Sequence, residues 1–107
     1  MTTFDKRKDA FESKFAHDAE LRFKAESRRN KLLGAWAAKL LGKQGADADA
    51  YIRSVIESDF EQAGDEDVFR KIRKDLDAAK VAQSDHQIRR TMDELMQQAI
   101  AQIQSES

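Results

Sequence analysis

Hydrophobic residues recur along most of this chain at the spacing of amphipathic helices. Four such segments follow residue 17, and each ends at a glycine or a short polar connection. The first begins after His17 and ends at Gly42, the second ends near residues 63–64, the third begins at Asp65, and the fourth begins at Ser84. Their predicted inward residues are, in chain order, Leu32, Leu33, Trp36, Ala37, Leu40 and Leu41; Ala48, Tyr51, Ile52, Val55, Ile56 and Phe60; Val68, Phe69, Ile72, Leu76 and Ala79; and Ile88, Met92, Leu95, Met96, Ala99 and Ile103. Four amphipathic helices joined by short connections predict an all-α fold, a four-helix bundle.

A separate aromatic stripe lies near the amino end. Phe4, Phe11 and Phe15 fall within about 40° of one another on a helix, but the same face meets charged residues one turn later. Two interpretations fit this stripe: it packs on its own bundle, or another protein covers it. We predict a mobile, partly helical N-terminal arm over residues 1–19, because an isolated helix of this length is marginal in water, and a bundle over residues 20–107.

The segment that joins the arm to the bundle carries few large apolar residues. Between Ala16 and Lys31, only Leu21 and Phe23 are apolar and larger than alanine, and they point about 160° apart on a helix. Two side chains so far apart do not share one narrow seam. The pattern therefore predicts a solvated helix here rather than a core helix.

Polar residues at the later boundaries predict how the helices begin. Asp47 is the predicted N-cap of the second helix, and Asp65 is that of the third. Ser84 and Gln87 have the spacing of a capping box, in which each side chain bonds the backbone N–H of the other residue.

The composition limits the possible classes of protein. A chain of 107 residues suits one small domain, and the absence of cysteine excludes a disulfide framework and a cysteine-based zinc site. No apolar run reaches the roughly 18 residues that span a bilayer, which predicts a cytoplasmic protein without direct membrane insertion. The pI of about 6.1 argues against a nucleic-acid partner. Charge is uneven, however: residues 1–31 hold nine Lys or Arg against six Asp or Glu, whereas residues 43–67 hold two against eight.

Residues able to carry catalysis or to bind a metal ion form no recognisable pattern. Neither His17 nor His86 has the Glu three residues earlier that di-metal helical bundles use. No glycine-rich phosphate loop is present, and no nucleophile with a base can be assigned by spacing. We therefore predict neither an enzyme nor a metal-binding protein. His86 fits a surface position in the first turn of the last helix, and His17 borders the arm and the body.

A basic cluster lies between the arm and the hydrophobic half of the first bundle helix. Its members are Arg22, Lys24, Arg28, Arg29 and Lys31. The pattern favours a solvated basic face, because acidic residues are interspersed with these cations. The alternative is a contact for a phosphate group or for an acidic partner.

Three long stretches of the chain resemble one protein family. The similarity lies in KFAHDAELRFKAESRRNKLLGAWAAKLLG, GDEDVFRKIRKDLDAA and SDHQIRRTMDELM, which occur in the same order in the zeta inhibitor subunit of alpha-proteobacterial ATP synthases. The resemblance implies a four-helix bundle preceded by a mobile inhibitory segment. In that family, the segment inserts at a catalytic interface between an alpha and a beta subunit of the synthase head and blocks ATP hydrolysis.

Carried onto this chain, the resemblance assigns the inhibitory segment to residues 1–19. The implied partner contacts are Phe4, Lys6, Arg7, Lys8, Phe11, Lys14, Phe15 and His17. The implied partners are the alpha and beta subunits, with the gamma subunit as a further contact, and the free protein is expected to be a monomer that reaches the inner membrane only through the synthase. No resident cofactor is expected. Weak binding of ATP or ADP is also implied, and its only candidate is the basic cluster from Arg22 to Lys31.

The chain departs from the pattern of the family at two places. Lys6 and Lys8 stand where relatives often carry acidic residues, and Ala63 stands where relatives often carry a proline. The first departure leaves the strength of inhibition open. An alternative function is therefore a nucleotide-binding regulator, or a helical adaptor of the synthase, without strong inhibition; the adaptor would dock through the acidic segment at residues 57–67.

Overall fold

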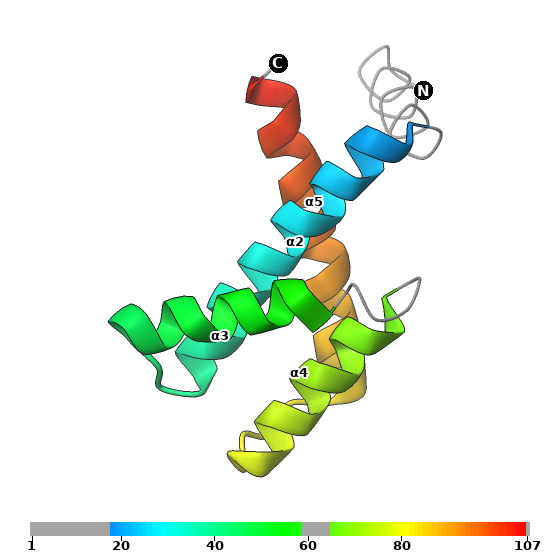
Figure 1. Ribbon diagram of the computed structural model, residues 1–107. Helices are drawn as coiled ribbons and strands as arrows, with labels where there is room; N and C mark the ends of the chain where they lie inside the picture. Colours follow the sequence, from blue (N-terminus) through cyan, green and yellow to red (C-terminus); the bar gives the residue numbers. More distant parts are fainter. Residues whose placement is uncertain (1–17, 59–64, 107) are drawn as a thin grey trace.

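The computed structural model describes residues 18–58 and 65–106. These residues form four helices: α2 (Ala19–Leu40), α3 (Gly45–Ser58), α4 (Glu66–Ala78) and α5 (Asp85–Glu106). Figure 1 shows their arrangement. The all-α fold and the four helices of the bundle are therefore confirmed. Residues 1–17 of the predicted N-terminal arm, the predicted end of the second helix at residues 63–64 and the inward position of Phe60 lie outside the described residues. Asp18 and Ala19, which the prediction also assigned to the arm, form the N-cap and the first residue of α2.

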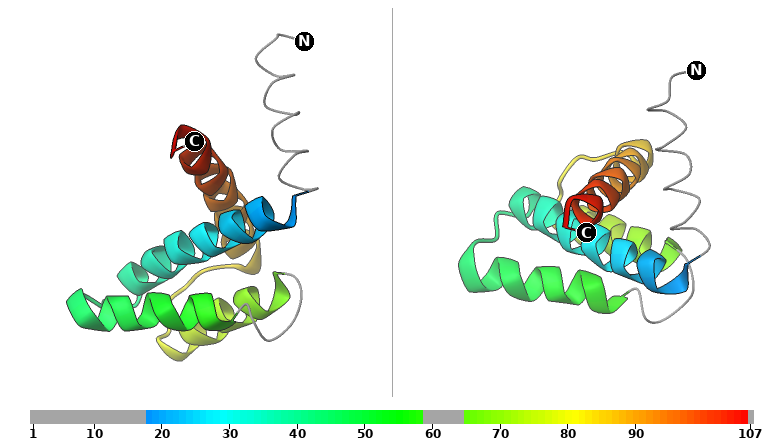
Figure 2. Two further views of the ribbon diagram at one scale, coloured as in Figure 1. Left: turned by 45° about the horizontal axis from the view of Figure 1, so that its top comes forward. Right: turned by 90° about the horizontal axis from the view of Figure 1, so that it is seen from above.

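Helix α2 is the central element, because its two halves pack against different partners. The second half lies beside α3, and the first half crosses α5, as Figures 1 and 2 show from three directions. Gly34 permits the close approach of α3: a Cβ atom at this position would lie 3.0 Å from the Cα of Ile52. Helix α4 completes the bundle by packing against α2, α3 and α5.

The main core lies where all four helices meet. Its most deeply buried side chains are Leu33 of α2, Val55 of α3, Val68, Ile72 and Leu76 of α4, and Ile88 of α5. Trp36 and Phe69 are half-buried and pack against this core, as the helical spacing predicts. Fully burying each aliphatic side chain contributes about 1.5–3 kcal/mol to folding. The prediction is wrong at Ala79, which is exposed because α4 ends at Ala78 and the chain turns away there.

A second, smaller core joins the first half of α2 to the last turns of α5. Ala25 and Ile103 are buried there, and Leu21, Met96 and Ile100 pack around them. A solvated helix between residues 16 and 31 is therefore a wrong prediction from Leu21 onward. The small side chain of Ala25 leaves room for α5, which covers the face of α2 that carries Leu21 and Ala25. Phe23 is 57% exposed, which agrees with the prediction that it does not share a seam with Leu21.

Of the three predicted N-caps, the one at Asp47 is wrong, and Asp65 holds its predicted position without a side-chain capping bond. Helix α3 begins at Gly45, where φ is +57°, and the carbonyl of Gln44 accepts bonds from the N–H groups of Asp47 (3.2 Å) and Ala48 (3.4 Å). Asp47 therefore lies in the first turn rather than at the N-cap, because the glycine allows the helix to start earlier. Asp65 does occupy the N-cap of α4, but its side chain makes no capping bond.

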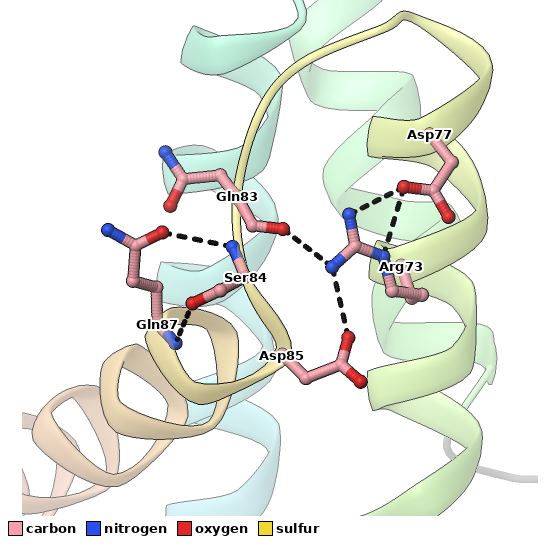
Figure 3. Close-up of polar contacts among 6 residues, drawn as sticks. All are labelled: Arg73, Asp77, Gln83, Ser84, Asp85 and Gln87. Atoms are coloured by element: carbon pink, nitrogen blue, oxygen red, sulfur yellow. Dashed lines mark hydrogen bonds and ion pairs between the residues drawn. The ribbon is translucent and has the colours of Figure 1, made fainter.

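The predicted capping box of α5 is confirmed, and Figure 3 shows it. The N–H of Ser84 donates to Oε1 of Gln87 (2.9 Å), and the N–H of Gln87 donates to Oγ of Ser84 (3.1 Å). Arg73 of α4 fixes the same connection by donating to the carbonyl of Gln83 (2.6 Å) and to Asp85 (3.0 Å). These bonds fix the first residue of α5. The start of α5 in turn sets which of its later residues contact α2.

Candidate partner-binding site

The partner contacts expected from the resemblance fall on the arm. Phe4, Lys6, Arg7, Lys8, Phe11, Lys14, Phe15 and His17 lie outside the described residues. Their assignment stays a prediction. What the structure describes is the point where the arm is attached, together with the surfaces of the bundle.

Asp18 marks the attachment point because it caps the first turn of α2. Its backbone is extended (φ −98°, ψ 108°), and its Oδ1 accepts bonds from the N–H groups of Glu20 (3.0 Å) and Leu21 (3.1 Å). These two N–H groups have no partner within the helix, so the carboxylate satisfies them. Its negative charge also interacts favourably with the positive end of the helix dipole. Helix α2 therefore starts at a defined residue.

Arg28 ties the attached end of α2 to the last turn of α5. Its two terminal nitrogens bond the two carboxylate oxygens of Glu106 (2.7 and 3.0 Å), and one of them also donates to Oε1 of Gln102 (3.1 Å). The hydrogen bonds lower the pKa of Glu106 and raise that of Arg28. This bidentate pair and the smaller core join the same two segments, the first half of α2 and the last turns of α5, so packing and charge act together there.

Arg29 is buried, with only 2% of its side chain exposed. Its Nε donates to Oδ1 of Asn30 (2.6 Å), and a terminal nitrogen donates to Oδ1 of Asp65 (2.9 Å). The carboxylate of Asp65 is thereby directed to α2 instead of capping α4. A solvated basic face is thus a wrong prediction at Arg29, which instead connects α2 to the start of α4.

The basic cluster does not converge on one point. On a helix, Lys24 and Lys31 lie about 20° apart, whereas Arg22 lies on nearly the opposite side. These three cations are exposed, while Arg28 and Arg29 bond carboxylates of their own chain. A contact of Arg22, Lys24 or Lys31 with a phosphate group or an acidic partner stays a prediction.

A surface recess that the sequence analysis missed lies between the α2–α3 connection, α3 and α4. It has a volume of about 430 Å³ and is lined by Leu41, Lys43, Tyr51, Lys71, Asp75, Ala78 and Ala79. The hydroxyl of Tyr51 donates to Oδ2 of Asp75 (2.8 Å), and Nζ of Lys71 donates to the same oxygen (3.0 Å). The ammonium groups of Lys43 and Lys71 lie 5.8 and 5.2 Å from the centre of the Tyr51 ring.

The surroundings of Tyr51 disfavour loss of its proton. Loss of solvent raises the pKa of the phenol strongly, and the hydrogen bond to Asp75 raises it further. A phenol is neutral at physiological pH even at its ordinary pKa of about 10, so the shift reinforces that state, and the two ammonium groups face a neutral aromatic ring. The spacing of Lys71 and Asp75 at i and i+4 was visible in the sequence, but Tyr51 fits the apolar stripe of α3 and gave no sign of a polar role.

The described residues give no geometry for a metal site. Within residues 18–58 and 65–106, no three His, Cys, Asp or Glu side chains lie close enough together to hold a metal ion. His86 is exposed in the first turn of α5, as predicted. No helix in this part of the chain is long and apolar enough to cross a membrane.

The chain is similar to a known protein family and to a solved structure. A family model described as ATPase inhibitor subunit zeta matches residues 1–102. A solved structure, described as the solution NMR structure of a protein, is 46% identical to this chain and has a TM-score of 0.71; the match covers 81% of this chain and 99% of that one. A search of curated proteins gave no match.

Proposed function

Because the chain belongs to the ATPase inhibitor subunit zeta family, we propose that it inhibits ATP hydrolysis by an F-type ATP synthase by inserting residues 1–19 at a catalytic interface between an alpha and a beta subunit. The family match carries this proposal, since it extends from residue 1 to residue 102 and so includes the whole arm as well as the bundle. An inhibitor family indicates a regulatory role and an association with the synthase. The identity of the contacted subunits and the insertion of the arm between them are the parts that we propose.

The aromatic stripe supplies the contact energy of the insertion. Burying Phe4, Phe11 and Phe15 gives about 5–9 kcal/mol gross, whereas ordering the backbone of the arm costs roughly 1–2 kcal/mol per residue before helical hydrogen bonds offset it. The aromatic rings alone therefore leave little surplus. Cations of the arm, such as Lys8 and Lys14, add affinity if the groove presents carboxylates to them.

The inserted arm blocks the catalytic cycle by conformational trapping. A catalytic site that must open and close around its nucleotide cannot complete these motions with a helix wedged at its interface. The bundle remains outside and holds the base of the wedge. Asp18 caps the start of α2 at the end of the arm, and the Arg28–Glu106 pair joins the first half of α2 to the last turn of α5.

An ATPase assay on the isolated synthase head tests this function. The full chain should stop hydrolysis, and a variant with Phe4, Phe11 and Phe15 all changed to Ala should lose inhibition by at least about tenfold, because the burial of three rings is lost. Phe23→Ala is the matched control: it removes one exposed phenyl ring outside the arm and should retain inhibition. Full inhibition by the triple variant, with normal helix content, would contradict the assignment of the arm.

A further inference from the structure

The recess around Tyr51 has the features of a second docking site. We propose that it binds an acidic segment of the protein that the arm inhibits, so that the bundle and the arm hold one partner at two places. The inference rests on the proposed function for the identity of the partner. It rests on Lys43, Lys71 and the Tyr51 ring for the site itself.

Positive charge in the recess exceeds negative charge. Among the described residues that line the recess, Asp75 is the only one with a carboxylate, and its Oδ2 already accepts bonds from both Tyr51 and Lys71. Lys43 contacts the Tyr51 ring and makes no ion pair with any residue that the structure describes. An ammonium group in this position is available to a carboxylate from outside.

The surroundings of the recess extend the same charge. Lys74 is exposed and follows Lys71 by three residues on α4, so the two lysines are neighbours on the surface of this helix. Asp47 precedes Tyr51 by one turn of α3 and is exposed, but it does not line the recess. Leu41, Ala78 and Ala79 add apolar surface to the lining, together with the ring of Tyr51. This combination fits an Asp or Glu side chain whose neighbours are apolar.

The shape favours a protein segment over a small anion. Sites for small molecules enclose most of the ligand surface and converge several polar groups on it. Here the side chains of Lys71 and Asp75 each keep 26% of their surface exposed, and the cations continue along α4 outside the recess. An extended acidic surface would meet Lys43, Lys71 and Lys74 together, which a single phosphate group would not.

The position of the recess makes two-point binding effective. It lies at the α2–α3 connection and the carboxyl end of α4, far from the amino end of α2 to which the arm is joined (Figure 1). The 22 residues of α2 span about 33 Å, so the two contacts would meet separate parts of a large partner. A second contact on the same partner raises the effective concentration of the arm even if each contact alone is weak.

Binding of the full-length protein to the isolated synthase head, measured by surface plasmon resonance at two salt concentrations, tests the site. Lys43→Glu should weaken binding about tenfold and reduce its salt dependence, whereas Lys43→Arg should bind like the unchanged protein. Lys39→Glu is the charge-matched control, because Lys39 is exposed in the last turn of α2 and does not line the recess. Equal affinities for Lys43→Glu and the unchanged protein, or an equal loss with Lys39→Glu, would overturn the proposal.

Two further measurements separate the possible causes. In the variant with Phe4, Phe11 and Phe15 changed to Ala, the remaining weak binding should disappear when Lys43→Glu is added. If this triple variant still blocks hydrolysis, the proposed function fails, whatever the effect of Lys43→Glu.

Titration of the full chain with inorganic phosphate and with ADP, followed by the amide signals of Lys43 and Tyr51, should show no saturation below millimolar concentration. Saturation that Lys43→Glu removes would assign the recess to a small anion and overturn the docking proposal.

Discussion

At the scale of single residues, Arg29 and Asp65 form an ion pair in which one partner is buried and the other is half-exposed. The side chain of Arg29 is 2% exposed, whereas that of Asp65 is 51% exposed. Asp65→Ala leaves a buried guanidinium without its carboxylate, and we expect this to lower the free energy of unfolding by about 3 kcal/mol. Arg29→Met removes the buried charge and leaves a carboxylate that water can reach, so it should cost only about 1 kcal/mol, chiefly through the hydrogen bond that Asn30 loses. Urea denaturation of both variants measures the difference, and a larger cost for Arg29→Met would show that Asp65 is not what compensates the buried charge.

Asp18 permits a second prediction at this scale. Asp18→Ala removes the oxygen that satisfies the N–H groups of Glu20 and Leu21, so it should lower the stability of the protein by about 1 kcal/mol. Asp18→Asn keeps an acceptor and should cost a few tenths of that. Thermal unfolding and amide exchange at Glu20 and Leu21 measure both effects. If the two variants were equally destabilised, the charge of Asp18 rather than its capping bond would be the stabilising feature.

At the scale of helices, the contact of α2 with α5 is sensitive to acid. The bond from Arg28 lowers the pKa of Glu106 below its ordinary value of 4.5, so this carboxylate stabilises the fold at pH values above 4.5, and the contribution is lost as the pH falls through the lowered pKa. In Arg28→Gln the pKa of Glu106 should return toward 4.5. The difference in stability between this variant and the unchanged protein should therefore shrink below pH 4. Urea denaturation between pH 3 and 7 tests this, and a difference that is independent of pH would exclude the ion pair as its cause.

The contact of α2 with α3 depends on Gly34. A Cβ at this position would lie 3.0 Å from the Cα of Ile52, so Gly34→Ala forces the two backbones apart. We expect a net loss of about 1–2 kcal/mol although alanine is the better helix former. Ala35→Gly, at the next and exposed position, is the control and should cost about 1 kcal/mol through helix propensity alone. An increase in the melting temperature of Gly34→Ala would show that α3 can shift without loss of packing.

The helices differ in how far their sequences could predict them. The faces of α4 and α5 were predictable, because Val68, Ile72 and Leu76 or Ile88 and Met92 repeat at the helical period and all face one core. The first half of α2 was not, because its partner lies 74–78 residues later in the chain and its buried positions include a small residue and a cation. The recess was missed for a similar reason: Lys43, Tyr51 and Lys71 come from three separate segments, and only the fold brings them together.

At the scale of the whole molecule, the described core consists of side chains from α2, α3, α4 and α5, and its amino-terminal boundary is the cap at Asp18. Removal of residues 2–17 should therefore abolish inhibition while it shifts the melting temperature by no more than about 2 °C, because every side chain assigned to the two described cores is kept. Removal of residues 2–20 also takes away Asp18 and should lower the melting temperature by about 4–8 °C, the shift that a lost cap of about 1 kcal/mol produces in a domain of this size. Calorimetry on the two truncated chains, beside an ATPase assay on the synthase head, compares them. A large destabilisation in the shorter deletion would mean that the aromatic stripe packs on its own bundle, which is the alternative interpretation of that stripe.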